Sequence, residues 1–214
     1  MLRRNISNAA LLTMLTGATL AAQQSDARLV GRLSRSAVDS VTALTGHATA
    51  RGLPIEPLIQ KALEGQSKGA EDRLILRAVE DLLDRLNRAS AALGDDADDS
   101  ELVAAAGAMH LGVSTGTLQN VVAAYRDQSL AVPLVVLTDM IRKGVAVPTA
   151  SSVIVQLVEA RVDIESLQRF RRLVERDISS GAAPGEAAII RARGALLERQ
   201  RGFSPPAPEW RPLF

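Results

Sequence analysis

The chain has 214 residues, of which 47% are hydrophobic and 23% charged, and its formal net charge is +1. This balance excludes an intrinsically disordered chain, and the length is sufficient for one ordinary domain with a hydrophobic core. The near-zero charge gives no electrostatic reason to bind nucleic acid, and the lack of cysteine excludes disulfides and thiolate metal sites.

Aromatic residues make up only 2% of the chain, so its core must be packed with Leu, Val, Ile and Ala. Cores rich in alanine and leucine suit close helix–helix packing, whereas sheets prefer β-branched and aromatic residues. The composition therefore favours an all-α fold.

The N-terminus has the three parts of a secretory signal peptide. Arg3 and Arg4 form a basic start, and an uncharged stretch follows from Ala9 to a small-residue cleavage site after Ala21 or Ala22. This stretch is too short for a membrane span, which needs about 20 apolar residues. We expect a periplasmic or secreted protein with no stable membrane span after leader removal; the alternative is an amphipathic helix of the fold itself.

Apolar residues recur at three- and four-residue intervals along the rest of the chain, which predicts consecutive helices. The predicted helices are Ser36–Arg51, a short one from Pro57 to near Gly65, Glu71–Leu93, one capped by Asp99 or Ser100 and ending at His110, one from Ser114 or Thr115 to Asp127, Pro148–Ala160, Asp163–Ser179 and Pro184–Arg201. The predicted organisation is a signal peptide (1–22), a linker (23–35), a helical domain (36–201) and a proline-rich aromatic tail (202–214).

The segment Leu130–Leu137 fits two structures. Its residue types are those of a buried strand, but Pro133 lies inside it and a helical pattern continues to Ile141. Because proline removes a ladder hydrogen bond from a strand and suits the first turn of a helix, a buried helix opening at Pro133 is favoured.

A similar turn recurs between the predicted helices. Gly52-Leu53, Gly112-Val113, Gly144-Val145 and Gly181-Ala182 each end one helix before the next, and Arg161-Val162 is a variant without glycine. Regular helix–turn units predict either a multi-helix orthogonal bundle or a short solenoid-like stack. The simpler alternative is that glycine is common after helices in general.

The stretch from Gly52-Leu-Pro-Ile-Glu-Pro57 to Gly65 resembles segments of uncharacterised exported bacterial all-helical proteins. The resemblance covers this stretch and, loosely, the helices after it. It implies an exported helical protein and no particular activity.

The run Gly112-Val-Ser-Thr-Gly116 matches the pattern of a hydrolase nucleophile elbow around Ser114. That chemistry needs a strand before the serine and a histidine from elsewhere, whereas a helix is predicted here. A helix end followed by a cap explains the run better. The two histidines, His47 and His110, lack the partner spacing of a metal site and are expected at helix ends or on the surface.

Two charged regions are interpreted as solvated surface. The acidic loop from Asp95 to Ser100, together with Glu101, lacks the glycine and ligand order of a calcium-binding hand. The last two helices, after Asp163, are rich in arginine, but interleaved acids predict ion pairs three or four residues apart. Contact with a membrane surface or an anionic polymer is the minor alternative.

The C-terminal tail carries four large apolar side chains among prolines: Phe203, Trp210, Leu213 and Phe214. These residues either pack back on the helical domain or contact a protein partner, as aromatic anchors in proline-rich segments do. They are the only site residues that the sequence suggests.

The sequence therefore predicts an exported, non-enzymatic cell-envelope protein that acts through contacts with a protein partner. No catalytic, cofactor-binding or metal-binding residue is assigned, and no cofactor or nucleic-acid partner is expected. Two alternatives stay open. One is a helical module that binds an apolar ligand in a dry pocket. The other is an envelope hydrolase with two convergent carboxyl groups, at least one of raised pKa.

Overall fold

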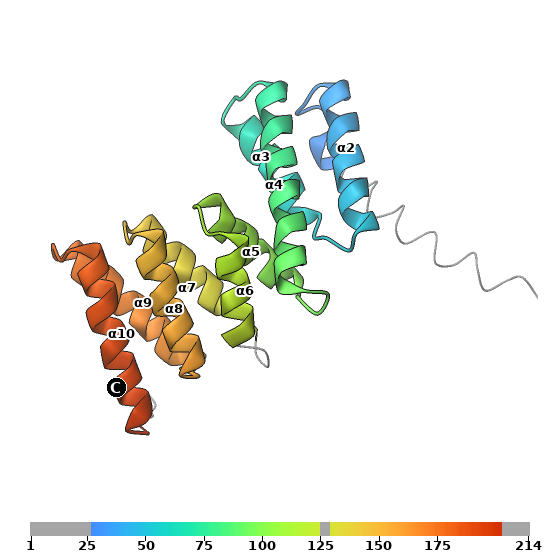
Figure 1. Ribbon diagram of the computed structural model, residues 1–214. Coiled ribbons are helices and arrows are strands. Elements are labelled where there is room, and N and C mark those ends of the chain that lie inside the picture. The colour runs from blue at the N-terminus through green and yellow to red at the C-terminus, as the bar shows by residue number, and fades with distance from the viewer. Residues whose placement is uncertain (1–26, 125–128, 203–214) are drawn as a thin grey trace, which may run out of the picture. The chain divides into compact units, whose positions relative to one another are not determined.

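A computed structural model describes residues 27–124 and 129–202 (Figure 1). Its regular structure is helical and contains no strand within these ranges, which confirms the predicted all-α class. The range 36–201, expected as one helical domain, divides by its contacts into two compact units that meet in sequence between Asn87 and Arg88. No helix in the described ranges combines the length and the apolar character needed to cross a bilayer.

The first unit contains helices α2 (Arg35–Ala50) and α3 (Glu56–Ser67) and most of α4 (Asp72–Leu93). Helices α2 and α3 are in contact. A Cβ added at Gly65 would lie 2.7 Å from Cγ1 of the buried Ile75, so α3 and α4 approach closely where glycine allows it. This helix–helix contact depends on the absence of a side chain at position 65.

The N-terminal edge of this unit lies within the range expected as a linker. Leu29 is 1% exposed and belongs to the core. The neighbouring Arg28 makes a bidentate ion pair with Glu56 at the start of α3, with both N–O distances 2.8 Å. The chain is therefore anchored to the helices from about residue 28.

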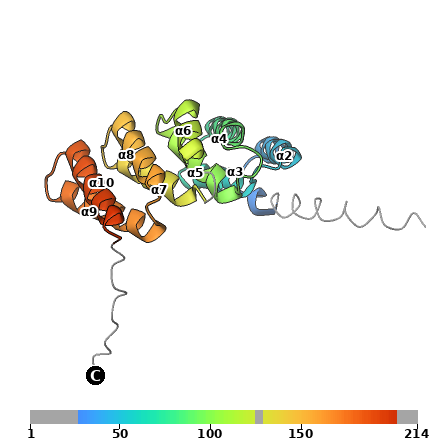
Figure 2. The same ribbon diagram turned by 60° about the horizontal axis from the view of Figure 1, so that its bottom comes forward.

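The second unit contains the end of α4 and helices α5 (Asp99–His110), α6 (Thr115–Ala124), α7 (Ala131–Arg142), α8 (Val147–Glu159), α9 (Ile164–Ser179) and α10 (Pro184–Gln200). Its helices from α5 onward form two rows. Helix α7 contacts α5 and α9 in one row, and α8 contacts α6 and α10 in the other, as Figures 1 and 2 show. Contacts of α7 with α8 and of α9 with α10 join the rows. Of the two arrangements left open by the glycine spacing, an orthogonal bundle or a solenoid-like stack, these two rows of helix–turn units correspond to the stack.

The same turn joins four pairs of successive helices in this unit: α5 to α6, α7 to α8, α8 to α9 and α9 to α10. In each turn, the backbone carbonyl of the third residue from the end of the preceding helix accepts a hydrogen bond. The donor is the amide of the residue that follows the left-handed position, which is the Schellman geometry. The four donor–acceptor pairs are Val113 N to Ala108 O, Val145 N to Met140 O, Val162 N to Leu157 O and Ala182 N to Asp177 O, at 3.0–3.1 Å. The left-handed residue is glycine in three turns and Arg161, with φ 52°, in the fourth.

Two details at helix starts differ from the sequence prediction. Helix α5 is capped by Asp98, not by Asp99 or Ser100. The Asp98 carboxylate accepts from the Glu101 amide at 2.9 Å, and the Asp98 amide donates to the Glu101 carboxylate at 3.1 Å. This reciprocal pair is a capping box. The ambiguous 130–137 segment is helical, as favoured, but α7 begins at Ala131 rather than at Pro133.

Glu101 also links two helices of the second unit. Glu101 is 9% exposed, and the second oxygen of its carboxylate accepts a hydrogen bond from the backbone amide of Leu130 at 2.6 Å. Leu130 precedes α7, so one side chain caps α5 and satisfies an amide at the start of α7. A buried carboxylate is stable here because both oxygens are hydrogen-bonded.

Candidate functional site

Two grooves of the second unit follow the exposed side of α8. A groove of about 530 Å³ lies between α6 and α8, and a second of about 440 Å³ lies between α8 and α10. Both are lined by Pro148, Ser152 and Gln156, which we call the α8 ridge. The two grooves therefore flank one ridge, and α6, α8 and α10 lie side by side in Figures 1 and 2.

The sequence of α8 explains why this ridge faces outward. Ridge residues recur every four positions, which places them on one face of the helix. The opposite face is apolar and buried, with Ala150, Ile154, Leu157 and Val158 among its residues. The Gln156 amide nitrogen donates to the Ser152 hydroxyl at 3.1 Å, so the two polar side chains of the ridge hold one another.

The lining of both grooves is almost free of charge. Its uncharged polar side chains are hydroxyls and carboxamides from α6, from the residue before it and from α8: Ser114, Thr117, Asn120, Thr149, Ser151, Ser152 and Gln156. No charged residue occurs between Lys143 and Glu159 in the sequence. The surface thus offers hydrogen-bond donors and acceptors without a strong electrostatic field.

Ser151 adds a polar group in the wall of the α6–α8 groove. The residue is 8% exposed, and its hydroxyl has no hydrogen-bond partner among the described residues. Buried hydroxyls are usually paired, since an unpaired one costs free energy. The groove wall therefore holds an unused donor and acceptor.

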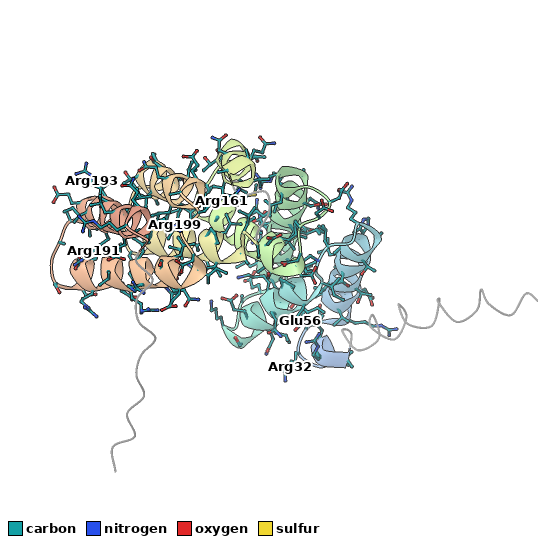
Figure 3. All side chains as sticks on the ribbon, turned by 90° about the horizontal axis from the view of Figure 1, so that it is seen from below. Arg32, Glu56, Arg161, Arg191, Arg193 and Arg199 are labelled. Atoms are coloured by element: carbon teal, nitrogen blue, oxygen red, sulfur yellow. The ribbon has the colours of Figure 1, made fainter. Side chains whose placement is uncertain are left out.

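Arg193 is the single charged residue that lines these grooves, on the α10 side. Its neighbour Arg191 makes a bidentate ion pair with Asp177 of α9, at 2.6 and 2.8 Å. Arg193 has no carboxylate partner in the described part of the chain, and the two arginines project to different sides of α10 in Figure 3. One arginine thus fixes α10 to α9, while the other stands at the edge of the groove.

Ser114, singled out by the nucleophile-elbow pattern, lies at the edge of the α6–α8 groove and caps α6. Its hydroxyl accepts from the Thr117 amide at 3.1 Å and pairs with the Thr117 hydroxyl at 2.9 Å. Helix α5, not a strand, precedes it, and His110 at the end of α5 is exposed. The interpretation as a helix end followed by a cap accounts for the motif.

The remaining charged candidates lie apart from these grooves. His47 is exposed on α2, and no group of three or more His, Asp or Glu residues in the described ranges is arranged to hold a metal ion. In the acidic loop, hydrogen bonds from Ser100 and the Glu101 amide lower the pKa of the Asp98 carboxyl. That aspartate serves α5 as its cap.

The resolved pKa shifts of carboxyl groups in the described ranges all point downward. Hydrogen bonds from Arg28 and then Gln60 lower the pKa of Glu56 to about 2, and hydrogen bonds from Lys61 and Lys68 lower that of Glu64 to about 2. The Arg191 guanidinium likewise lowers the pKa of Asp177. A general acid of a glycosidase needs the opposite shift.

Arginine-rich α9 and α10 carry several cross-helix ion pairs. Besides Arg191, Arg171 bonds to Asp139 of α7 at 2.7 Å, and Arg169 lies 3.5 Å from Glu198 of α10. The expected pairing at three- or four-residue spacing is represented by Arg169 and Glu165, 3.6 Å apart, whereas the shorter pairs link different helices. The tail residues Phe203, Trp210, Leu213 and Phe214 lie outside the described residues.

Sequence reasoning did not find the α8 ridge. The available signal was the run from Gly144 to Val158, which has no charged residue although it has polar residues at four-residue spacing. On an exposed helix, such a run indicates a face that is not merely solvated. Comparison with known proteins found no matching family model, no similar curated protein and no similar solved structure.

Proposed function

We propose that this chain is an exported, non-enzymatic protein of the bacterial cell envelope that acts through protein–protein contacts made on the α8 ridge and its grooves. The observation that carries the contact proposal is a surface continuous over three helices, with hydrogen-bonding side chains and almost no charge. Stacked helical units commonly present such extended binding surfaces.

Two further observations support contact rather than small-ligand binding. The grooves are shallow and lie on the surface along one helix, instead of enclosing a volume within the core. The more apolar groove between α7 and α9, lined by Val132, Val135 and Val136, has only about 170 Å³. That volume is below the roughly 300–1,000 Å³ of usual ligand pockets, whereas the two grooves beside α8 fall within this range but are open along the surface.

Export is tested by expressing the full chain in a bacterial host and determining the N-terminus of the protein in each cell fraction by mass spectrometry. We expect a mature chain that begins after Ala21 or Ala22 in the periplasm or medium. An intact Met1 terminus confined to the cytosol would contradict the export proposal.

The contact is tested by placing a photo-reactive amino acid at Ser152 on the ridge and, as a matched control, at the exposed Ser179 of α9. After irradiation of intact cells, position 152 should give a discrete cross-linked band and position 179 should not. Equal cross-linking at both positions, or none at position 152, would remove the ridge as the contact surface.

The aromatic tail is a second proposed contact. Removing residues 203–214 should reduce the yield of the position-152 adduct if Trp210 and its neighbours anchor the same partner. An unchanged yield would indicate that the tail contributes nothing to this interaction.

A further inference from the structure

Resting on the proposed function, we propose that the α8 ridge and its two grooves bind an extended polypeptide segment of five or six residues. The segment would have small, uncharged side chains over the ridge and an acidic side chain beside Arg193. The proposal thus gives the partner a chemical class and places its acidic side chain at the α10 side of the site.

The hydrogen-bonding groups of the site match those of a peptide backbone. Asn120 and Gln156 each carry a donor and an acceptor on one planar amide, the same pair that a peptide unit presents. Hydroxyls of Thr117, Ser152 and Thr149 lie among them. Extended peptides gain affinity through their main-chain groups and specificity through shallow side-chain pockets.

The dimensions also suit such a segment. Packed helices lie about 8–10 Å apart, so a ligand crossing from α6 over α8 to α10 spans roughly 16–20 Å. An extended chain covers about 3.3 Å per residue, which gives five or six residues. Pro148 leaves its end of the ridge low enough for a backbone to pass over it because its side chain is short, and Ser152 and Gln156 lie one and two turns further along α8.

Charge and composition argue against other polymers. A nucleic acid requires several cations for its phosphates, whereas Arg193 is the single charged residue in the lining of the two grooves. Neither lining contains an aromatic ring on which a base or sugar could stack. A neutral chain with one carboxylate complements what the surface offers.

Ser151 gives the independent sign that the site is built for a ligand. Its hydroxyl is buried and lacks a partner in the described ranges, although it lines the α6–α8 groove. A rotation about χ1 turns a serine hydroxyl between staggered positions. A peptide carbonyl or amide in the groove would then satisfy it.

The test uses the full chain and a phage-displayed library of random ten-residue peptides. Enriched peptides are synthesised with a fluorophore, and their dissociation constants are measured by fluorescence anisotropy. We expect peptides that combine Ser, Thr, Ala or Gly with one Asp or Glu. Ser152→Arg should weaken binding at least tenfold because its long cation obstructs the ridge, whereas the matched control Ser179→Arg should bind like the wild type.

Two milder variants separate binding from folding. Ser151→Ala should weaken peptide binding three- to tenfold, the loss of one hydrogen bond, while the midpoint of urea unfolding stays the same or rises. In Arg193→Gln, replacing the acidic residue of the peptide by its amide should no longer change the affinity. If Ser151 and Arg193 acted only in folding, neither the loss of peptide affinity at an unchanged unfolding midpoint nor the loss of the effect of the peptide's acidic residue would be observed.

Several results would overturn the inference. These are no enrichment above the bare support, enrichment of basic or aromatic peptides, or equal affinity for the wild type and Ser152→Arg. None of them decides the proposed function, because cross-linking at position 152 in cells reports a contact of any chemistry. Failure of the peptide class and failure of the contact surface are thus distinguishable.

Discussion

At the residue scale, the turns between helices depend on one left-handed position each. Gly181 has φ 97° and open space around it, so its requirement for glycine is conformational and not steric. Residues with a Cβ are strained in this region by about 1–2 kcal/mol. Arg161 occupies the equivalent position in another turn with φ 52°, which shows that the turn forms even where its sequence is unfavourable.

We predict that Gly181→Ala lowers the free energy of unfolding by about 1 kcal/mol, because alanine strains the turn before α10. Its matched control is Gly194→Ala in the middle of α10, which also has open space and should raise stability by about 0.5–1 kcal/mol through helix propensity. Urea denaturation of the full chain measures both. Changes of the same sign would contradict the assigned turn geometry.

The Arg28–Glu56 pair gives a prediction of pH dependence. Because the pKa of Glu56 is lowered to about 2, its ion pair stabilises the fold above the unfolded pKa of about 4.3 and is lost as the pH falls toward 2. Both side chains are partly exposed, so the stabilisation at neutral pH is about 1 kcal/mol or less.

Glu56→Gln should therefore be less stable than the wild type at pH 6 and equal to it near pH 2, as measured by urea unfolding at a series of pH values. In an Arg28→Met background, the same substitution should change stability little at either pH. A difference that persists at pH 2 would show that Glu56 acts through contacts other than its charge.

At the element scale, the helices and their order could be predicted from sequence because each has a clear apolar period and a stop signal. The face of each helix that is buried was harder to predict. Leu74 and Ile75 are adjacent apolar residues of α4, yet Leu74 is 49% exposed whereas Ile75 is 2% exposed and Leu83 is buried. A 22-residue helix with leucines at adjacent positions has two overlapping stripes, and tertiary contacts decide which is buried.

Glu101 could not have been predicted to join two helices, since its contact with Leu130 spans 29 residues. Glu101→Ala should lower the free energy of unfolding by about 2–3 kcal/mol, because it leaves the buried Leu130 amide without an acceptor. Glu101→Gln should cost less, since its carboxamide oxygen still accepts from one of the two amides.

Urea unfolding of these variants is compared with Asp99→Ala, which removes a neighbouring but exposed carboxylate. Asp99→Ala is expected within about 0.5 kcal/mol of the wild type. If Asp99→Ala and Glu101→Ala had equal effects, the link between α5 and α7 would contribute nothing to stability.

At the scale of the whole molecule, the all-α class and the repeated helix–turn unit followed from composition and glycine spacing. The α8 ridge did not, because a groove forms where helices α6, α8 and α10 pack, and their adjacency is not encoded in any local pattern. The candidates that stood out in the sequence were instead Ser114 and the aromatic tail. Of these, Ser114 proves to be a helix cap at the edge of the groove.

The central claim, that an exported chain uses the α8 ridge to contact another protein, can be tested in one experiment because the chain contains no cysteine. Single variants Ser152→Cys and Ser179→Cys are labelled with a membrane-impermeant maleimide, both purified and in cells whose outer membrane has been permeabilised. We predict equal labelling of the purified proteins, rapid labelling of position 179 in cells, and slow labelling of position 152 in cells. Equal labelling of both positions in cells, or no labelling of either, would contradict the account.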